Sequence, residues 1–351
     1  MNFNFLATPE YDFLEDLKDR LIILAVGGSH AYGMNVDTPE HKSDIDLRGI
    51  MMDKKEDLLL LKEPSEYIDN NTDSVIYSFN KIARLLINCN PNVCEILGCR
   101  PEDYAYISSL GQLLIDNQQA FLSQRCLQSF GGYAYQQLSR LENALARDHL
   151  SQSKKEEHIL NSVKSAMLTI NRRYSEMPEK SMKLYIDDSE KNGMDSEIFI
   201  DINLTHYPLR DLNGIWNEFV SIPRQYSKVN HRNRKKDDIH LNKHAAHLIR
   251  LYLMLIDILD EGKIITYREK DHDLLMSIRN GDFMKDDGTY KPEFFDLLNE
   301  LKAKVEKSTE TTWLPKEPDF EKINQIIIDV NYSVIRGGRT NETIFCREVF
   351  R

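Results

Sequence analysis

The chain has 351 residues, of which 41% are hydrophobic, and its formal net charge at pH 7 is −11. That length suffices for one large domain or two ordinary ones with buried cores. Because non-specific coating of nucleic acid needs a positive field over the whole protein, the acidic balance excludes proteins of that kind, although it leaves room for a local basic groove.

The five cysteines and the apolar segments indicate where the protein works. Cys89, Cys94 and Cys99 recur every five residues, a spacing that matches no common zinc site, so we expect reduced thiols. The first sixteen residues carry four carboxylates, unlike a signal peptide, and the apolar stretch 251–259 is too short to span a bilayer. We therefore expect a cytoplasmic protein without membrane segments.

The first third of the chain alternates between short helical and extended patterns. Asn90-Pro91-Asn92 predicts a break in the chain, with Asn92 as the N-cap of a helix and Glu95 three residues later. The remaining elements predicted here are a helix at 12–19, a buried strand at 21–26 that ends in a glycine turn, a strand at 43–52, a short helix or strand at 57–61, a strand at 73–79 and a helix at 80–88.

Long helical patterns dominate from about residue 109 onward. They cover 109–147, 153–176, 238–261 and 319–335, and an alternating patch at 197–201 predicts a strand. The sequence thus predicts an α+β fold, in which a small domain at 1–108, a mixed sheet with helices, is followed by a mainly α-helical domain at 109–351.

Three carboxylates carry the strongest chemical signal. Asp44 and Asp46 stand two residues apart in a predicted strand, so they point to the same face, about 7 Å apart. Carboxylate oxygens are the ligands that Mg²⁺ prefers, and two metal ions stabilise both the attacking and the leaving oxygen in phosphoryl transfer. Asp73, from a neighbouring strand, is expected to complete the site and to help activate an acceptor hydroxyl.

Gly28 and Ser29 follow the first strand directly. A glycine at this position allows the backbone to approach a phosphate closely, and the serine hydroxyl with nearby N–H groups is suited to holding a triphosphate. An isolated Asp-x-Asp is a weak signal, and the alternative is a solvated strand edge. The preceding Gly-Ser turn and the apolar flanks Ile45 and Leu47 favour a metal site.

Several segments resemble one known family. Residues 28–33 (Gly-Ser-His-Ala-Tyr-Gly), Thr38-Pro39 and residues 43–49 (Ser-Asp-Ile-Asp-Leu-Arg-Gly) are similar to the signature of DNA polymerase β superfamily nucleotidyltransferases, in the YcgL-like group that includes the RNA-ligase-associated (RlaP-like) members. Further similar segments are 73–81, 90–97, 243–250, 261–263 and 278–281. The loop that carries residues 40–42 is slightly longer here.

The resemblance implies a polymerase-β-type catalytic domain and a nucleotidyltransferase activity. Such an enzyme transfers a nucleoside monophosphate from an NTP, such as ATP, to an acceptor hydroxyl and releases pyrophosphate. We expect Asp44, Asp46 and Asp73 to hold two Mg²⁺ or Mn²⁺ ions, and Gly28 and Ser29 to hold the triphosphate. The expected acceptor is RNA, such as a tRNA or a broken RNA end.

Additional cations are candidates for phosphate contact. Arg48 shares a strand face with Asp44 and Asp46, so it is either a phosphate ligand or half of a structural ion pair. Lys243, His247 and Arg250 lie on one helical face, which suits a triphosphate or a nucleic-acid backbone, and the alternative is a solvated face.

A basic run precedes the helix predicted at 238–261. In an acidic chain it is a candidate for contact with RNA phosphates, and the alternative is a solvated loop. Its cations are Arg224, Lys228, Arg232, Arg234, Lys235 and Lys236.

Rival functions leave different marks on the sequence. A glycosyltransferase of the Asp-x-Asp type needs a larger nucleotide-binding domain than the 43 residues that precede Asp44. A non-catalytic module that binds RNA or neutralises a toxin would not need all three carboxylates. A protein or a small molecule as the nucleotide acceptor remains an alternative to RNA.

Overall fold

The computed structural model describes residues 3–36, 43–60, 62–149, 182–188, 196–203, 205, 209, 216, 238–337 and 343–346. The chain divides into two compact units. The first comprises Met1–Gln137, Ala245–Asp282 and Pro292–Arg351, and the second comprises Leu138–His244 and Phe283–Lys291. The predicted division into a catalytic domain at 1–108 and a helical domain at 109–351 stays a prediction.

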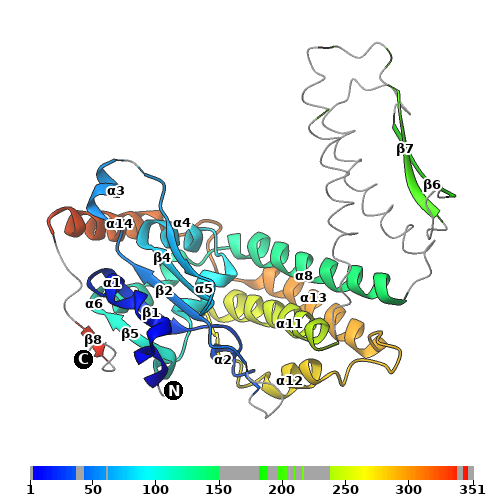
Figure 1. Ribbon diagram of the computed structural model, residues 1–351, viewed down its shortest axis with the longest axis horizontal. Coiled ribbons are helices and arrows are strands. Elements are labelled where there is room, and N and C mark those ends of the chain that lie inside the picture. Colours follow the sequence, from blue (N-terminus) through cyan, green and yellow to red (C-terminus); the bar gives the residue numbers. More distant parts are fainter. Residues whose placement is uncertain are drawn as a thin grey trace. The chain divides into compact units, whose positions relative to one another are not determined.

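A six-stranded mixed sheet forms the centre of the first unit (Figure 1). Its order is β3-β4-β2-β1-β5-β8, in which β2 and β4 run parallel and all other neighbours are antiparallel. The strands are β1 Leu21–Val26, β2 Leu47–Met51, β3 Glu66–Asp69, β4 Ser74–Ser78, β5 Tyr104–Ser108 and β8 Thr343–Cys346. The predicted α+β class with a mixed sheet is confirmed.

Helices connect these strands and make up most of the later chain. The predicted helices at 238–261 and 319–335 are confirmed, 109–147 divides into three helices, and 153–176 lies outside the described residues. The helices are α1 Phe13–Leu17, α2 Gly28–Ala31, α3 Lys55–Leu59, α4 Phe79–Ile87, α5 Pro91–Leu97, α6 Ser109–Asp116, α7 Gln118–Phe121, α8 Arg125–His149, α11 Asp238–Glu261, α12 His272–Asn280, α13 Pro292–Thr311 and α14 Phe320–Ile335, with 3₁₀ turns at Asn4–Ala7, Pro9–Tyr11, Lys18–Arg20 and Pro101–Asp103.

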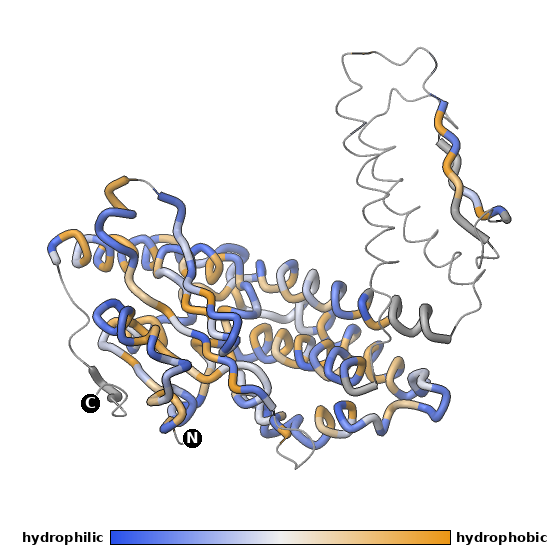
Figure 2. Tube along the Cα trace, viewed as in Figure 1, coloured by the Kyte–Doolittle hydropathy of each residue, from blue (hydrophilic) through white to orange (hydrophobic). Residues whose placement is uncertain are grey.

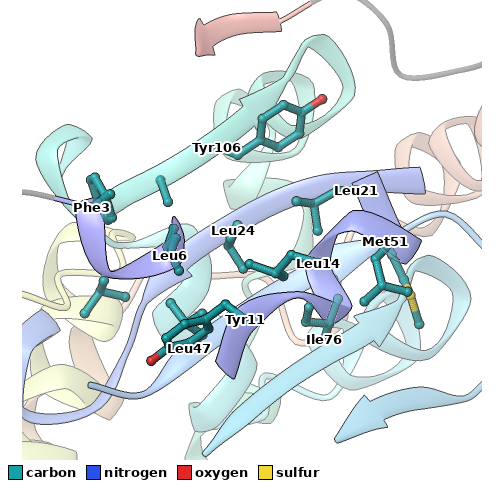
Figure 3. Close-up of a cluster of buried hydrophobic side chains, with 13 residues drawn as sticks. Phe3, Leu6, Tyr11, Leu14, Leu21, Leu24, Leu47, Met51, Ile76 and Tyr106 are labelled. Atoms are coloured by element: carbon teal, nitrogen blue, oxygen red, sulfur yellow. The ribbon is translucent and has the colours of Figure 1, made fainter. Parts of the chain in front are cut away.

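One face of the sheet is covered by the N-terminal segment. Leu24, Leu47 and Ile76 point to this face from three adjacent strands, and Leu6 and Leu14 pack against them (Figure 3). Alternation along the strands explains the arrangement, because residues two apart share a face. Burial of these apolar side chains anchors the N-terminal turns to the sheet.

The opposite face of the sheet carries one row of large side chains, Ile23, Ile50 and Tyr77, and beside it a row with smaller and polar ones. Ala25, Arg48 and Val75 are register partners across β1, β2 and β4, so they lie side by side on this face. Two of the three are small, and they leave space above the sheet. That space becomes the candidate site.

Two predicted strands begin later than expected. The strand predicted at 43–52 starts at Leu47, so Asp44 and Asp46 precede β2 and do not lie in a regular strand. The strand predicted at 73–79 starts at Ser74, and Asp73 occupies the turn before it with a φ of +45°. Asp44 and Asp46 are therefore not i and i+2 residues of a regular strand, as was predicted. The starts of β2 and β4 are nevertheless close together, so Asp46 and Asp73 are neighbours.

The helix after the chain break begins two residues earlier than predicted. Asn90, not Asn92, is the N-cap of α5, and its side chain accepts a hydrogen bond from the Asn92 N–H at 3.1 Å. Pro91 occupies the first helical position, where the missing N–H costs nothing. The capping interaction fixes the start of α5 and therefore the direction of its side chains.

Amphipathic patterning explains the later helices. Ile323, Ile326, Val330 and Val334 form the buried stripe of α14, and polar residues alternate with it along the helix (Figure 2). The part of the chain that the structure describes contains no helix long and apolar enough to cross a membrane.

The second unit contains a β-hairpin of β6 Met182–Asp188 and β7 Ser196–Ile202. The strand predicted at 197–201 is confirmed by β7. Tyr185 and Phe199 are register partners whose rings stack with centroids 6.0 Å apart, and such cross-strand aromatic pairs stabilise a hairpin.

Candidate active site

Asp46 and Asp73 form a carboxylate pair at the start of two parallel strands. Leu47 of β2 and Ser74 of β4 are register partners, so the residues that precede them are brought together. The two carboxyl groups lie close enough that a proton held by Asp46 would be shared with Asp73 as a hydrogen bond, which favours the protonated form of Asp46. Two carboxyl groups this close cannot both ionise easily in the absence of a cation.

The pKa of Asp46 is raised from 3.8 to about 7, mainly by burial and next by hydrogen bonding with Asp73. The guanidinium of Arg48 lowers the pKa, whereas the charges of Asp73 and Asp44 raise it. A carboxyl group whose pKa lies near 7 sits close to neutral pH, where a group that exchanges protons is most effective.

This shift predicts how stability depends on pH. Between about pH 4 and about pH 7, the folded chain binds a proton at Asp46 that the unfolded chain has lost, so the contribution of Asp46 to stability falls as pH rises. Asp46→Asn cannot titrate. We therefore expect its melting temperature, measured without divalent metal, to rise relative to that of the wild type from pH 4 to pH 8. A constant difference would contradict the raised pKa.

Arg48 links the two strand starts. Its Nη1 donates to the Asp73 carbonyl at 2.5 Å and to the Leu47 carbonyl at 2.9 Å, and its Nη2 lies 3.8 Å from Asp73 Oδ1. These contacts support the structural ion-pair interpretation. Because Arg48 also lines the cavity beside Asp46, the phosphate interpretation stays a prediction.

Gly28 lets the Asp46 carboxylate approach the loop that follows β1. Its φ is +59°, and a Cβ built at this position would lie 1.7 Å from Asp46 Oδ2. The space that the missing side chain provides is therefore filled by a site carboxylate. The sequence predicted that a glycine is needed here so that a phosphate can approach the backbone. The Asp46 carboxylate is a second reason for a glycine at this position.

Gly28→Ala is expected to lower the rate of the nucleotidyl transfer that the sequence resemblance implies about a hundredfold, because the carboxylate of Asp46 must move. The φ alone costs about 1–2 kcal/mol of unfolding free energy. Gly337→Ala is the matched control, since Gly337 has a φ of +80° and its Cβ would meet nothing within 4 Å. Equal effects of the two variants on the rate of transfer would contradict the role of Gly28.

A cavity of about 300 Å³ opens beside the carboxylate pair. Its floor is the row of Ala25, Arg48 and Val75 on the sheet. Residues on one face of α5 form a wall. Aliphatic side chains and two tyrosines share the lining with carboxylate, guanidinium and amide groups, and polar atoms contribute most of the cavity surface. The lining residues are Ala25, Val26, Gly27, Gly28, Ala31, Tyr32, Asp46, Arg48, Val75, Tyr77, Asn92, Glu95, Ile96, Cys99 and Thr266.

The predicted metal ligands are only partly gathered. Asp46 and Asp73 are adjacent, and Asp44 is exposed in the same short segment. Within the described residues, no group of three or more His, Cys, Asp or Glu side chains is arranged to hold a metal ion. The donor chemistry of the Asp46–Asp73 pair suits a divalent cation, because carboxylate oxygens are its preferred ligands and a cation would relieve their repulsion.

The three predicted cations of α11 are placed differently. Arg250 is fully buried, and its Nη1 donates to Glu95 Oε1 at 2.5 Å. Its Nη2 donates to His247 Nδ1 at 2.8 Å, since an arginine has no acceptor. Lys243 belongs to the second compact unit. Direct binding of nucleotide by these residues stays a prediction, and the contacts of Arg250 are internal.

Other predicted features have separate outcomes. Ser29 is half-buried on α2, and its carbonyl accepts from the Met34 N–H. The basic run from Arg224 to Lys236 and the longer loop at 40–42 lie outside the described residues. Cys89, Cys94, Cys99 and Cys126 are free thiols, as predicted.

Sequence reasoning gave no role to Tyr32, Tyr77, Cys99 and Thr266, which line the cavity. The signal for α5 was available, because Asn92, Glu95 and Ile96 have the i, i+3, i+4 spacing of one helix face, and Cys99 follows the end of the helix. No pattern in the sequence connects Thr266 to this cavity, since it reaches the site through the Glu95 carbonyl, 171 positions away.

Comparison with known proteins gives one family. The model of the RNA repair pathway DNA polymerase beta family, RlaP, matches residues 12–329. The matched range includes the carboxylate pair, the cavity and α11. Neither the search of curated proteins nor the search of solved structures found a match.

Proposed function

Since the chain belongs to the RNA repair pathway DNA polymerase beta family, we propose that it transfers a nucleoside monophosphate from an NTP to a hydroxyl group of RNA. The family agrees with the resemblance found in the sequence and indicates a nucleotidyltransferase-type function. The observation that carries the proposal is the Asp46–Asp73 carboxylate pair, at the edge of a cavity and against a glycine that admits it.

In the proposed reaction, the acceptor hydroxyl oxygen forms a bond to the α-phosphorus of the NTP. The bond between that phosphorus and the bridging oxygen breaks, and pyrophosphate leaves. The hydroxyl proton passes to a carboxylate of the Asp46–Asp73 pair, whose apparent pKa belongs to the pair as a unit. Gly28 and Ser29 bind the triphosphate through backbone N–H groups and the serine hydroxyl.

Asp44, Asp46 and Asp73 are the residues that would hold Mg²⁺ or Mn²⁺, with two ions expected. Bound divalent ions supply positive charge that stabilises the attacking and leaving oxygens. The chain's own contribution is the placement of the carboxylates. Parallel pairing of β2 and β4 sets their spacing, and Arg48 fixes the Asp73 backbone through its carbonyl.

Incubation with each α-³²P-labelled NTP, Mg²⁺ or Mn²⁺, and total cellular RNA and protein tests the proposal. Label in RNA supports it and identifies the base preference. Label in protein alone would favour protein nucleotidylation, and label in a small molecule would favour a small-molecule acceptor. Absence of label with all four NTPs and both metals would contradict transfer and favour a non-catalytic RNA-binding or toxin-neutralising module.

A further inference from the structure

The turn at residues 28–34, which begins with the short helix α2 and carries Gly28 and Ser29, is held in place through Tyr32. The Tyr32 hydroxyl donates to Glu95 Oε2 at 2.5 Å, and the guanidinium carbon of Arg250 lies 3.6 Å from the centroid of the Tyr32 ring. Arg250 Nη1 binds the other carboxylate oxygen of Glu95, also at 2.5 Å. One tyrosine is thus fixed by a carboxylate at its hydroxyl and by a cation over its ring.

Backbone hydrogen bonds connect Tyr32 rigidly to Gly28. The Tyr32 N–H donates to the Gly28 carbonyl at 3.3 Å, and the Met34 N–H donates to the Ser29 carbonyl at 2.8 Å. The segment 28–34 is therefore a compact turn rather than an open loop. A displacement of the Tyr32 side chain would be transmitted to the residues that face the triphosphate.

The segment between α11 and α12 holds the same turn from another side. A Cβ at Gly33, whose φ is +74°, would lie 2.5 Å from the Tyr267 ring, which has the Arg100 guanidinium carbon 3.5 Å from its centroid. The Arg268 N–H donates to the Tyr32 carbonyl at 3.2 Å. These contacts fix the backbone of the turn, whereas Glu95 and Arg250 fix the Tyr32 side chain.

We propose that Tyr32 is a positioning residue, which Glu95 and Arg250 hold in place so that Gly28 and Ser29 meet the NTP triphosphate in a fixed geometry. This inference rests on the proposed function. It assigns Arg250 an indirect role in nucleotide binding, since its guanidinium contacts Glu95, His247 and the Tyr32 ring. Glu95 of α5 and Arg250 of α11 then control nucleotide binding through Tyr32.

The Tyr32 hydroxyl is the specific element of this arrangement. Burial raises the pKa of Tyr32, which keeps the hydroxyl protonated and able to donate to Glu95. A phenylalanine would keep the ring under Arg250 but leave Glu95 Oε2 without this donor, in a site where unpaired acceptors are costly. Removal of the hydroxyl oxygen therefore weakens the attachment of Tyr32 to Glu95 without leaving a large cavity.

Tyr32→Phe is the test variant, and Tyr104→Phe is its matched control. Tyr104 is buried, and its hydroxyl also donates to α5, to the Ile96 carbonyl at 2.8 Å, but it belongs to β5 and not to the turn. Each variant removes one hydroxyl hydrogen bond, part-buried at Tyr32 and buried at Tyr104, so a loss of stability is expected in both. Only Tyr32→Phe is expected to act on the turn.

Two measurements on the full chain separate the roles. In transfer assays, we expect Tyr32→Phe to raise the KM for NTP about tenfold and to leave the KM for the acceptor unchanged, because misplacement of positioning groups commonly costs ten- to a hundredfold. In hydrogen exchange without nucleotide, we expect the amides of residues 28–34 to exchange at least about tenfold faster in Tyr32→Phe and unchanged in Tyr104→Phe.

Unchanged exchange across residues 28–34 in Tyr32→Phe would overturn the inference, whether or not the protein is active. Faster exchange with an unchanged KM for NTP would overturn it as well, since the turn would then not govern nucleotide binding. If the wild type transfers no nucleotide, the proposed function fails, and a loss of NTP affinity in Tyr32→Phe, measured by calorimetry, still decides whether Tyr32 positions the turn for a triphosphate.

Discussion

Asp46→Asn is expected to lower nucleotidyl transfer about a thousandfold, the upper range for removal of one preorganised charged or polar group from an active site. The amide keeps the shape of the side chain next to Gly28 but cannot ionise, accept the acceptor's proton or bind a divalent cation strongly. Initial rates at saturating NTP measure the effect, and the folded state is checked by its melting temperature.

Asp57→Asn is the control for the same chemical change. Asp57 forms an ion pair with Lys62 at 2.9 Å on the surface, and its variant is expected to keep wild-type activity. Asp73→Asn should resemble Asp46→Asn, because the two carboxyl groups form one pair in which each influences the charge of the other. Full activity of Asp46→Asn would contradict a catalytic role for Asp46 and would favour a non-catalytic module that binds RNA or neutralises a toxin.

The carboxylates were predictable because their signal is local. Asp46 follows Gly28-Ser29 within twenty residues, and the apolar flanks Ile45 and Leu47 indicate a chain that enters the core. The strand limits were less accessible, since ladder hydrogen bonds and not propensity decide where β2 begins. The parallel pairing that joins Asp46 to Asp73 is a tertiary fact that no spacing in the sequence encodes.

Among the elements that the sequence reading missed, α13 and β3 illustrate two different causes. Phe294, Leu298 and Leu301 of α13 have helical spacing, so this helix could have been predicted from periodicity. The strand β3 is a four-residue edge strand in which Glu66 and Asp69 flank Tyr67 and Ile68, and two strand-favouring residues are too short a pattern to predict a strand. It forms because β4 offers an open edge with which it pairs.

Arg250 shows where a correct local pattern leads to an incomplete interpretation. Its spacing from His247 and Lys243 on one helix face is real, and a cationic face suits phosphates. Its burial is set by Tyr32 and Glu95, which lie 218 and 155 positions earlier in the chain. The sequence identified the helix face, and tertiary packing determined what that face meets.

Arg250→Ala is expected to lower the free energy of unfolding by about 3–5 kcal/mol, because it leaves the Glu95 carboxylate buried without its cation. The side chains of Arg250 and Glu95 are 1% and 12% exposed, so both charges are largely removed from water. The loss includes packing of the guanidinium on Tyr32 and its contact with Met254 Sδ at 3.0 Å. Urea unfolding measures it, provided that the slope with denaturant is unchanged.

Arg84→Ala removes an ion pair of the same type from the surface and serves as the control. Arg84 and Glu63 are 66% and 91% exposed, and pairs of this kind contribute about 0–1 kcal/mol. A loss below 1 kcal/mol for Arg250→Ala would show that the buried pair is no stronger than the exposed one.

The double variant Arg250→Met/Glu95→Leu separates the ion pair from the packing that surrounds it. It removes both charges and is expected to recover much of the lost stability, since apolar replacement of a whole buried pair is often neutral. Among the described residues, Arg250 Nε has no hydrogen-bond partner, and its removal relieves that cost too. Such a variant would be stable yet defective in NTP binding, because Tyr32 would have lost both of the groups that hold it. Stability and positioning would then be separable in one protein, which is the expected outcome if the buried pair serves the turn at Gly28 rather than the fold alone.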